Sequence, residues 1–248
     1  MPEDRRVLAG APPPGPATWA YGDHADQVVE VWPGSQRCVV LLHGGFWREE
    51  YDRSHLRRAA AALAGDGVTV ALPEYRRVGG SGGWPQTFDD VREVMAQLPV
   101  QVGATSVVAV GHSAGGHLAL WAAAVAPPPH LVGVVGLAAV ADLAEAHQRR
   151  LDGDAVAALL AASPEEAPDR YREADPVQLP TPECPVQLLH APDDALVPIA
   201  LSRAYVRRHA AARLTEVPGG HFGLIDPESA AWPSVRAAVS DHWVPSAQ

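Results

Sequence analysis

The sequence predicts an α/β domain, in which a mostly parallel β-sheet carries helices on both faces. Two observations support this fold class. Short apolar runs rich in Val and Leu alternate with Ala-rich amphipathic runs, as in sheets whose strands are connected by helices. The chain also has 248 residues, of which 47% are hydrophobic, which is enough for one large domain with a sizeable core.

Strands are expected where apolar residues alternate with polar ones or form an uninterrupted run. Residues 27–32 (QVVEVW) alternate with period two. Residues 37–42 (RCVVLL) are almost continuously apolar, which is typical of a strand covered on both faces. By the same criteria, further strands are expected at 68–73, 106–110, 131–140, 184–190 and 213–217.

Helices are expected where apolar positions recur every three or four residues. In residues 87–98 this spacing joins Phe88, Val91, Met95 and Leu98, which gives the predicted helix one buried face. Further helices are expected at 54–67, which ends on a glycine, and at 116–126, 200–211 and 227–243.

Two stretches fall outside this alternation. Residues 1–17 are charged and then Pro-rich, so we expect a flexible arm ahead of a single domain that spans 18–248. Residues 143–182 are rich in Ala, Pro and charged side chains and separate two expected strands. We expect this segment to form a cap-like insertion over the strand ends; an ordinary long surface connection is the alternative.

The composition excludes several classes of function. The formal net charge of −10 argues against a nucleic-acid partner, because phosphate binding needs a basic surface. All 19 basic residues are arginines, so Schiff-base chemistry and pyridoxal-phosphate anchoring on a lysine are excluded. The N-terminus lacks the apolar core of a signal peptide, and no apolar run is long enough to cross a bilayer. We therefore expect a cytoplasmic protein without a membrane partner.

The cysteines and histidines give no sign of a metal site. Cys38 and Cys184 lie in or beside apolar strand-like runs, so we expect two reduced thiols, with a single disulfide as the alternative. His112 and His117 flank a Gly-rich turn, so they do not have the spacing of two zinc ligands on one helix. We expect neither a metal nor a cofactor.

The strongest chemical signal is GHSAG, which follows the strand expected at 106–110 and precedes a predicted helix. Gly-x-Ser-x-Gly in this context is typical of a nucleophile on a sharp strand-to-helix turn. Gly111 and Gly115 would remove two Cβ atoms from the crowded turn, and the N–H of Ala114 would point beside the hydroxyl. We interpret Ser113 as a nucleophile; a polar residue that merely caps a helix is the alternative.

A second segment with catalytic features, HGGFW, follows the strand expected at 37–42. Acyl transfer needs N–H donors aimed at the oxygen of a tetrahedral intermediate. We expect the N–H groups of Gly45 and Phe46 to form an oxyanion hole with that of Ala114. His43 is expected to brace the loop. Trp47 either lines the acyl pocket as a substrate-binding residue or belongs to the core.

Two further loops complete a possible catalytic set. HAPDDALVP follows the strand expected at 184–190 and offers two adjacent carboxylates, Asp193 and Asp194. PGGHFG follows the last expected strand and places His221 on a glycine-flanked loop. Serine, aspartate and histidine therefore each follow a strand, at the sheet edge where sites form in parallel sheets.

These motifs resemble the α/β-hydrolase superfamily over about residues 20–245. Within it, HGGFW, GHSAGGHLAL and GGHF look like the kynurenine formamidase (arylformamidase) group, as do YGDHADQVVEVW and EYRRVGGSGGWPQTFDDV. The chain is also similar to hormone-sensitive-lipase-like esterases, which usually carry His-Gly-Gly-Gly where Phe46 stands here. The resemblance implies an α/β-hydrolase fold, the triad Ser113, Asp194 and His221, and the oxyanion donors Gly45, Phe46 and Ala114.

The resemblance also bears on the details of the aspartate loop. Its register selects Asp194 as the catalytic acid and leaves Asp193 as a turn residue. The family's usual glycine after the histidine at position 190 is Ala191 in this chain.

The resulting functional hypothesis is a serine hydrolase that cleaves a small aryl formamide or amide, such as N-formylkynurenine, through an acyl-enzyme. A carboxylesterase for short-chain or aryl esters is the alternative, and a biosynthetic acyl hydrolase or transferase uses the same chemistry. A non-catalytic binding protein would need a lost triad member or a blocked oxyanion loop. The expected partner is a small ester or amide; the oligomeric state stays open, with a homodimer as one option.

Arg76 and Arg77 follow the strand expected at 68–73 and raise a separate question. They either meet a carboxylate of the substrate or form structural ion pairs, for example with Glu74 or with the cap.

Overall fold

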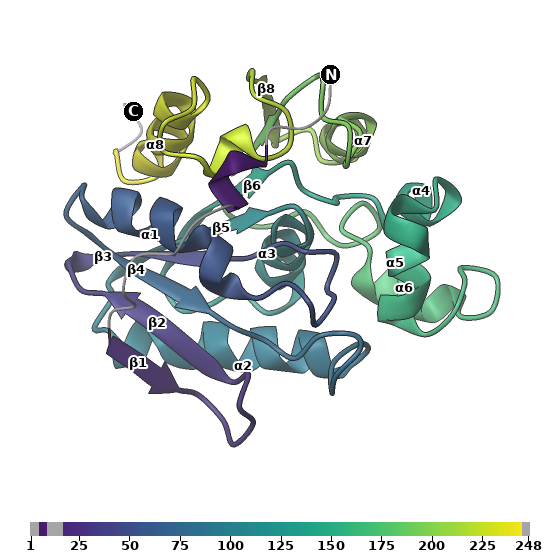
Figure 1. The fold of residues 1–248 in the computed structure, drawn as a ribbon, viewed down its shortest axis with the longest axis horizontal. Coiled ribbons are helices and arrows are strands. Elements are labelled where there is room, and N and C mark those ends of the chain that lie inside the picture. The colour runs from purple at the N-terminus through teal and green to yellow at the C-terminus, as the bar shows by residue number, and fades with distance from the viewer. Residues whose placement is uncertain (1–4, 9–16, 245–248) are drawn as a thin grey trace.

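The computed structural model describes residues 5–8 and 17–244 and confirms the predicted fold class (Figure 1). Eight strands form one sheet in the order β1-β2-β4-β3-β5-β6-β7-β8. β1 and β2 are antiparallel to their neighbours, and the other strands are parallel to one another. The strands are β1 (Ala17–Ala20), β2 (Val28–Trp32), β3 (Ser35–Leu42), β4 (Val68–Pro73), β5 (Ser106–His112), β6 (Leu131–Leu137), β7 (Val186–His190) and β8 (Arg213–Glu216).

Most of the helices connect successive parallel strands. The α-helices are α1 (Arg57–Ala64), α2 (Gln86–Gln101), α3 (Ala114–Val125), α4 (Leu143–Gln148), α5 (Leu151–Leu160), α6 (Pro168–Ala174), α7 (Ala200–Arg208) and α8 (Trp232–Asp241). Three short 3-10 helices are η1 (Arg6–Leu8), η2 (Arg53–Leu56) and η3 (Gly223–Ile225). No helix in the described ranges is both long and apolar enough to span a membrane.

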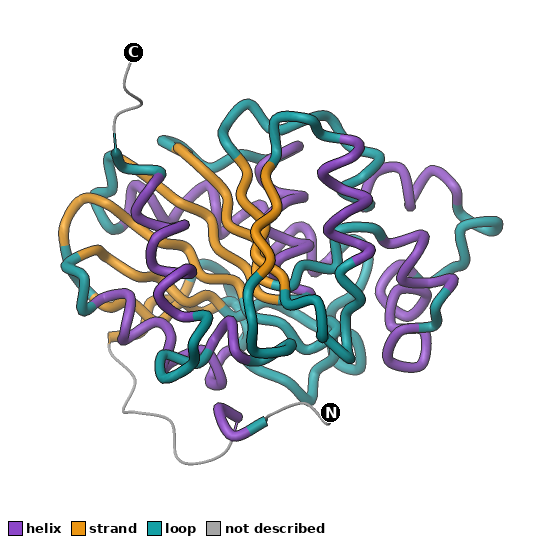
Figure 2. The backbone as a smooth tube through the Cα atoms, turned by 90° about the horizontal axis from the view of Figure 1, so that it is seen from above, coloured by secondary structure: helices purple, strands orange, loops and turns teal. Residues whose placement is uncertain are grey.

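The central strands divide their apolar side chains between two hydrophobic clusters, one on each face of the sheet. Along β3, Val40 and Leu42 belong to the cluster that also contains the buried residues of α2, α3 and α7. Val39 and Leu41 belong to the cluster with α1 and α8. Because successive side chains of a strand point to opposite faces, a continuous apolar run serves both clusters. Figure 2 shows the strands running between the two helical layers.

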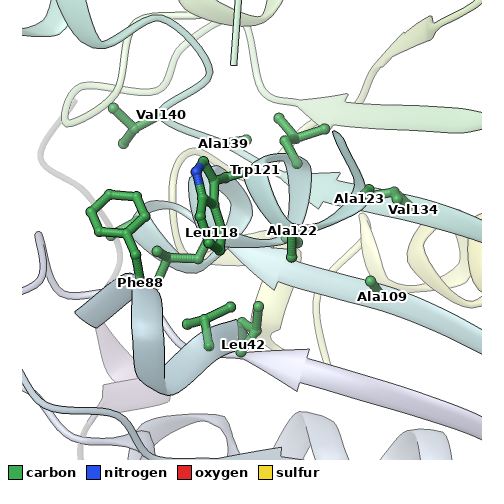
Figure 3. Packing of buried hydrophobic residues seen from close by; sticks show 14 of the residues in the cluster. Leu42, Phe88, Ala109, Leu118, Trp121, Ala122, Ala123, Val134, Ala139 and Val140 are labelled. Atoms are coloured by element: carbon green, nitrogen blue, oxygen red, sulfur yellow. The ribbon is translucent and has the colours of Figure 1, made fainter. Parts of the chain in front are cut away.

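α3 is the most deeply buried helix, and it begins directly after Ser113. Its packing therefore fixes the position of the backbone that follows Ser113. Figure 3 shows its Leu118, Trp121 and Ala122 packed among Leu42 of β3 and Phe88 of α2. The rings of Phe88 and Trp121 meet edge to face, with centroids 5.0 Å apart. Such dense packing on both sides holds the helix in one position relative to the sheet.

The structure differs from the sequence-based expectation near the N-terminus. Of the expected flexible arm at residues 1–17, positions 1–4 and 9–16 lie outside the described residues. Arg5–Leu8 includes η1, whose Val7 is buried, and Ala17 already belongs to β1. β1 was missed because it has only four residues and none of them is buried, so it shows no apolar periodicity.

The segment expected to form a cap, 143–182, contains α4, α5 and α6 and lies to one side of the sheet in Figure 1. Asp152 connects it to the loop after β3, because it binds Arg48 with a side-chain oxygen at 2.5 Å and its carbonyl oxygen at 2.6 Å. Asp152 and Asp154 adopt left-handed backbone conformations, with φ of 48° and 70°.

Candidate active site

Ser113 stands on a strained turn between β5 and α3. Its φ of 55° and ψ of −117° lie outside the regions that L-residues normally occupy. Its side chain makes no capping hydrogen bond to the helix, so the helix-cap alternative is not supported. The backbone N–H donates to Leu137 O at 2.8 Å, and the carbonyl accepts from Val140 N at 3.1 Å. Strain of this kind persists where the surroundings hold it, and it is concentrated at functional sites.

The glycines around Ser113 are required by close backbone contacts. A Cβ on Gly111 would lie 2.1 Å from Gly115 O, and a Cβ on Gly115 would lie 2.1 Å from Leu42 O. These distances are far below van der Waals contact, so no side chain fits at either position unless the backbone shifts. The absent Cβ atoms let α3 begin directly against the end of β3, as the motif predicts.

Asp194 and His221 form a buried hydrogen-bonded pair. His221 Nδ1 lies 2.7 Å from Asp194 Oδ2. The other carboxylate oxygen, Oδ1, accepts from the N–H groups of Leu196 and Val197, each at 2.8 Å. Asp193 is exposed, so the geometry favours Asp194 as the acid residue.

The surroundings of Asp194 keep it ionised. Burial by itself raises the pKa of this carboxyl, but hydrogen bonds from His190 and His221 and from the Val197 N–H outweigh that effect. The pKa of Asp194 therefore lies well below its usual value. An ionised carboxylate on Nδ1 fixes the orientation of the His221 ring.

The loop after β3 holds three consecutive residues in left-handed backbone conformations. Gly45, Phe46 and Trp47 have φ of 104°, 47° and 58°. Among the hydrogen bonds of the described residues, neither the N–H of Gly45 nor that of Phe46 finds an acceptor, and both residues line the cavity beside Ser113. Unpaired, partly buried N–H groups beside a strained serine fit the geometry of an oxyanion hole.

His43 braces this loop, as the sequence predicts. Its Nε2 lies 2.6 Å from Glu74 Oε1, and its Nδ1 lies 2.8 Å from Gly44 O. The Tyr75 ring stacks on the imidazole with centroids 4.3 Å apart, and the Tyr75 hydroxyl donates to His43 O at 2.8 Å. His43 is fully buried and does not line the cavity.

Arg76 and Arg77 form structural ion pairs, which is one of the two roles that the sequence left open for them, and the structure gives no support to a contact with a substrate carboxylate. Arg76 binds both oxygens of Asp90, at 2.9 and 2.6 Å. Arg77 is 5% exposed and pairs with Glu74 and with Asp26. Neither arginine lines the cavity beside Ser113.

Trp47 belongs to the core, so the expectation that it binds substrate is corrected. It is fully buried, and its ring meets His117 edge to face with centroids 5.1 Å apart. It does not line the cavity, which is lined by its neighbour Phe46 instead.

Ser113 and His221 line a common cavity of about 340 Å³. Apolar and aromatic walls come from residues that include Leu8, Phe46, Tyr51, Leu196 and Phe222, and carboxylates come from Glu50, Asp52 and Asp152. In the described ranges, no cluster of His, Cys, Asp and Glu has a geometry suited to a metal ion. Both cysteines are free thiols; Cys38 is buried and Cys184 half-buried.

Several supporting residues escaped the sequence analysis. His112 Nε2 donates to His221 O at 3.0 Å and so holds the histidine loop against β5. His190 Nε2 lies 3.3 Å from Asp194 Oδ2. Arg5 and Leu8 also line the cavity. The motifs GHSAG and HAPDD contain His112 and His190, but residue type alone does not reveal which atoms they contact.

Comparisons with known proteins identify a family and a fold for this chain. A family model described as BD-FAE matches residues 32–208, more than half of the chain. No curated protein sequence matches the chain significantly.

Solved structures share the fold at low sequence identity. A truncated carbohydrate esterase from gut microbiota has a TM-score of 0.75 and 18% identity, over 92% of this chain and 99% of that one. Esterase B from Lactobacillus rhamnosis, inhibited by a tributyrin phosphonate, has a TM-score of 0.74 and 18% identity, over 95% and 87%. A thermophilic esterase from Thermogutta terrifontis with propionate bound has a TM-score of 0.70 and 18% identity, over 92% and 93%. With its eight-stranded sheet and helices on both faces, the chain has the α/β-hydrolase fold and belongs to the BD-FAE family.

Proposed function

We propose that the protein is a serine carboxylesterase that hydrolyses esters of small carboxylic acids. The observation that carries the proposal is the convergence of Ser113, the hydrogen-bonded Asp194–His221 pair and the Gly45–Phe46 loop at one cavity. The similar structures support the reaction type, since they include an esterase inhibited by a tributyrin phosphonate and one with bound propionate.

The first half-reaction uses the triad. His221 Nε2 takes the proton of Ser113 Oγ as the oxygen attacks the carbonyl carbon of the ester. His221 Nδ1–H donates to Asp194, which orients the ring and stabilises the imidazolium. When the tetrahedral intermediate collapses, the imidazolium returns its proton to the alcohol that leaves, and the acyl group stays on Ser113.

The oxyanion is stabilised by backbone donors. The N–H groups of Gly45, Phe46 and Ala114 would take the negative charge that develops on the carbonyl oxygen. Ala114 is the first residue of α3, so the positive end of the helix dipole adds to this stabilisation. In the second half-reaction, a water molecule that gives its proton to His221 attacks the acyl-enzyme. When this intermediate collapses, the acid leaves and His221 returns the proton to Ser113 Oγ, which regenerates the free enzyme.

The cavity sets the size of the proposed substrate. Its volume of about 340 Å³ lies near the lower end of the roughly 300–1,000 Å³ that small-molecule sites span. Aromatic walls from Phe46, Tyr51 and Phe222 favour an apolar acyl or aryl group. Short-chain or aryl esters satisfy both conditions.

Aryl formamides are a second candidate, because the HGGFW segment resembles that of the arylformamidase group. Turnover of p-nitrophenyl acetate and of N-formylkynurenine, measured side by side, distinguishes the two. We expect kcat/KM for the ester to exceed that for the formamide and to be lost in Ser113→Ala. The reverse preference would replace the esterase proposal with a formamidase.

A non-catalytic binding protein is the remaining alternative. A fluorophosphonate reacts irreversibly with an activated serine, so mass spectrometry should find the label on Ser113 of the folded protein and none in His221→Ala. A folded wild-type protein that does not react would contradict the hydrolase proposal.

A further inference from the structure

The N-terminal residues Arg5–Leu8 pack against the candidate active site although they are far from it in sequence. Val7 is 7% exposed and belongs to the hydrophobic cluster that includes Leu224 and Ile225 of η3. In Figure 1 the short purple helix of this segment lies beside the yellow C-terminal part of the chain, and Figure 2 places it next to the loops at the same edge of the sheet. The segment is therefore docked on the folded domain.

Two side chains of this segment reach the substrate cavity. Arg5 and Leu8 line it together with Ser113 and His221. Arg5 Cζ lies 5.7 Å from the centroid of the Phe222 ring, a cation–π contact that holds the guanidinium next to the catalytic histidine loop. Leu8 is 39% exposed, so it offers apolar surface to the cavity without being part of the core.

The charge of the cavity wall makes Arg5 distinctive. Among the described residues that line the cavity, Arg5 is the one arginine, whereas Glu50, Asp52 and Asp152 contribute carboxylates. Asp152 is already paired with Arg48, at 2.5 Å. Arg5 therefore supplies a permanent positive charge at the wall formed by the N-terminal segment.

We propose that Arg5 and Leu8 are specificity-determining residues, which form the far wall of the acyl pocket. Leu8 limits the length of the acyl chain, and Arg5 favours an acyl group that ends in a carboxylate. The inference rests on the proposed esterase function. It assigns the recognition of anionic substrates, which the sequence suggested for Arg76 and Arg77, to a different arginine.

Substitutions of Leu8 test the limit on size. We expect Leu8→Ala to raise the ratio of kcat/KM for p-nitrophenyl octanoate over p-nitrophenyl acetate about threefold to tenfold, and Leu8→Trp to lower it about tenfold, because a change of a few methylene groups in a pocket has effects of this order. Val125→Ala is the matched control, since Val125 is also partly exposed, at 42%, and lies at the end of α3 away from the cavity. Ratios within twofold of wild type in both Leu8 variants would overturn the role of Leu8.

A substitution of Arg5 tests the preference for charge. p-Nitrophenyl hemisuccinate and p-nitrophenyl butyrate have acyl chains of equal length, and only the former ends in a carboxylate. We expect Arg5→Gln to lower the hemisuccinate-to-butyrate ratio of kcat/KM about fivefold, the effect of one partly exposed ion pair. Arg92→Gln is the control, because Arg92 also stacks on a ring, that of Trp121 at 5.3 Å, but does not line the cavity.

The outcomes separate this inference from the proposed function. An active wild-type esterase whose ratios do not change in the Arg5 and Leu8 variants overturns the specificity wall alone. Equal losses on both substrates in Arg5→Gln would likewise contradict it, since they would indicate a general loss of structure. A folded wild-type protein that hydrolyses none of the esters overturns the esterase proposal and this inference together.

Discussion

The contact between Gly115 and the end of β3 makes a strong prediction about catalysis. In Gly115→Ala, the new Cβ would lie 2.1 Å from Leu42 O and 2.4 Å from His43 O. Relief of these clashes requires α3 and β3 to separate by about 1 Å, because Cβ atoms do not approach other heavy atoms closer than about 3 Å. Ser113 lies at the start of α3 and the oxyanion loop follows β3, so the nucleophile and its oxyanion donors would move apart.

The expected magnitudes follow from this displacement. A misplacement of about 1 Å between reacting groups costs about 100-fold in rate. Overpacking of a rigid core costs about 1–3 kcal/mol of the free energy of unfolding. We therefore expect Gly115→Ala to fold with a reduced Tm, to lose about 100-fold in kcat on p-nitrophenyl acetate, and to keep KM within a few-fold of wild type.

Gly223→Ala is the matched control for this experiment. A Cβ on Gly223 would meet its nearest neighbour at 3.8 Å, which is an ordinary contact, so we expect wild-type kcat and Tm. Thermal unfolding and steady-state kinetics check both variants. If Gly115→Ala folds and retains kcat within threefold of wild type, the clash is relieved elsewhere and the argument that Gly115 sets the catalytic geometry is refuted.

Three further predictions concern groups around the site. Asp194→Asn should fold but lose about 10³–10⁴-fold in kcat on p-nitrophenyl acetate, because the amide no longer stabilises the His221 imidazolium; an active variant would exclude Asp194 as the triad acid. Tyr75→Phe removes the hydroxyl bond to His43 O and should lower kcat about tenfold, whereas Tyr171→Phe, which removes a bond to Ala162 O, should cost a similar amount of stability without changing kcat. Burial lowers the pKa of His117 to about 4 and holds that of His112 well below its usual value. Below pH 6.5 the unfolded chain therefore takes up protons that the native protein does not. As the pH falls, the free energy of unfolding should decrease by about 1.4 kcal/mol per pH unit for each of these two histidines. Urea unfolding at pH 7 and pH 5 measures this dependence, and His117→Gln should remove the contribution of one histidine from it.

The sequence predicted the parallel strands and the candidate triad because each leaves a local signal. A strand buried on both faces is a continuous apolar run, as in β3, and the residues directly after such strands gather at one edge of the sheet. Ser113 adds a glycine pattern that a sharp turn requires. These signals depend on a few neighbouring residues, so they can be recognised without knowledge of the tertiary structure.

The contacts that support the site were not predictable in this way. Glu74 binds His43 across 31 positions of the sequence, and Arg5 meets Phe222 across 217. The segment EYRR allowed an ion pair between Arg77 and Glu74 as well as a contact with substrate, and only the tertiary structure decides between them. Trp47 looked equally suited to a pocket or to a core, because a large apolar side chain fits both, and only its tertiary contact with His117 shows that it is in the core.

The docking of the N-terminal segment has a consequence for biosynthesis. Residues 5–8 are synthesised long before the ring of Phe222 and the cluster around Leu224 that they cover. Loop-closure entropy grows only slowly with loop length, so the long separation delays this contact without making it costly. The part of the cluster around Val7 that Leu224 and Ile225 contribute is absent until those residues have been made. A nascent chain would therefore have to extend through η3 before its acyl pocket gains the outer wall.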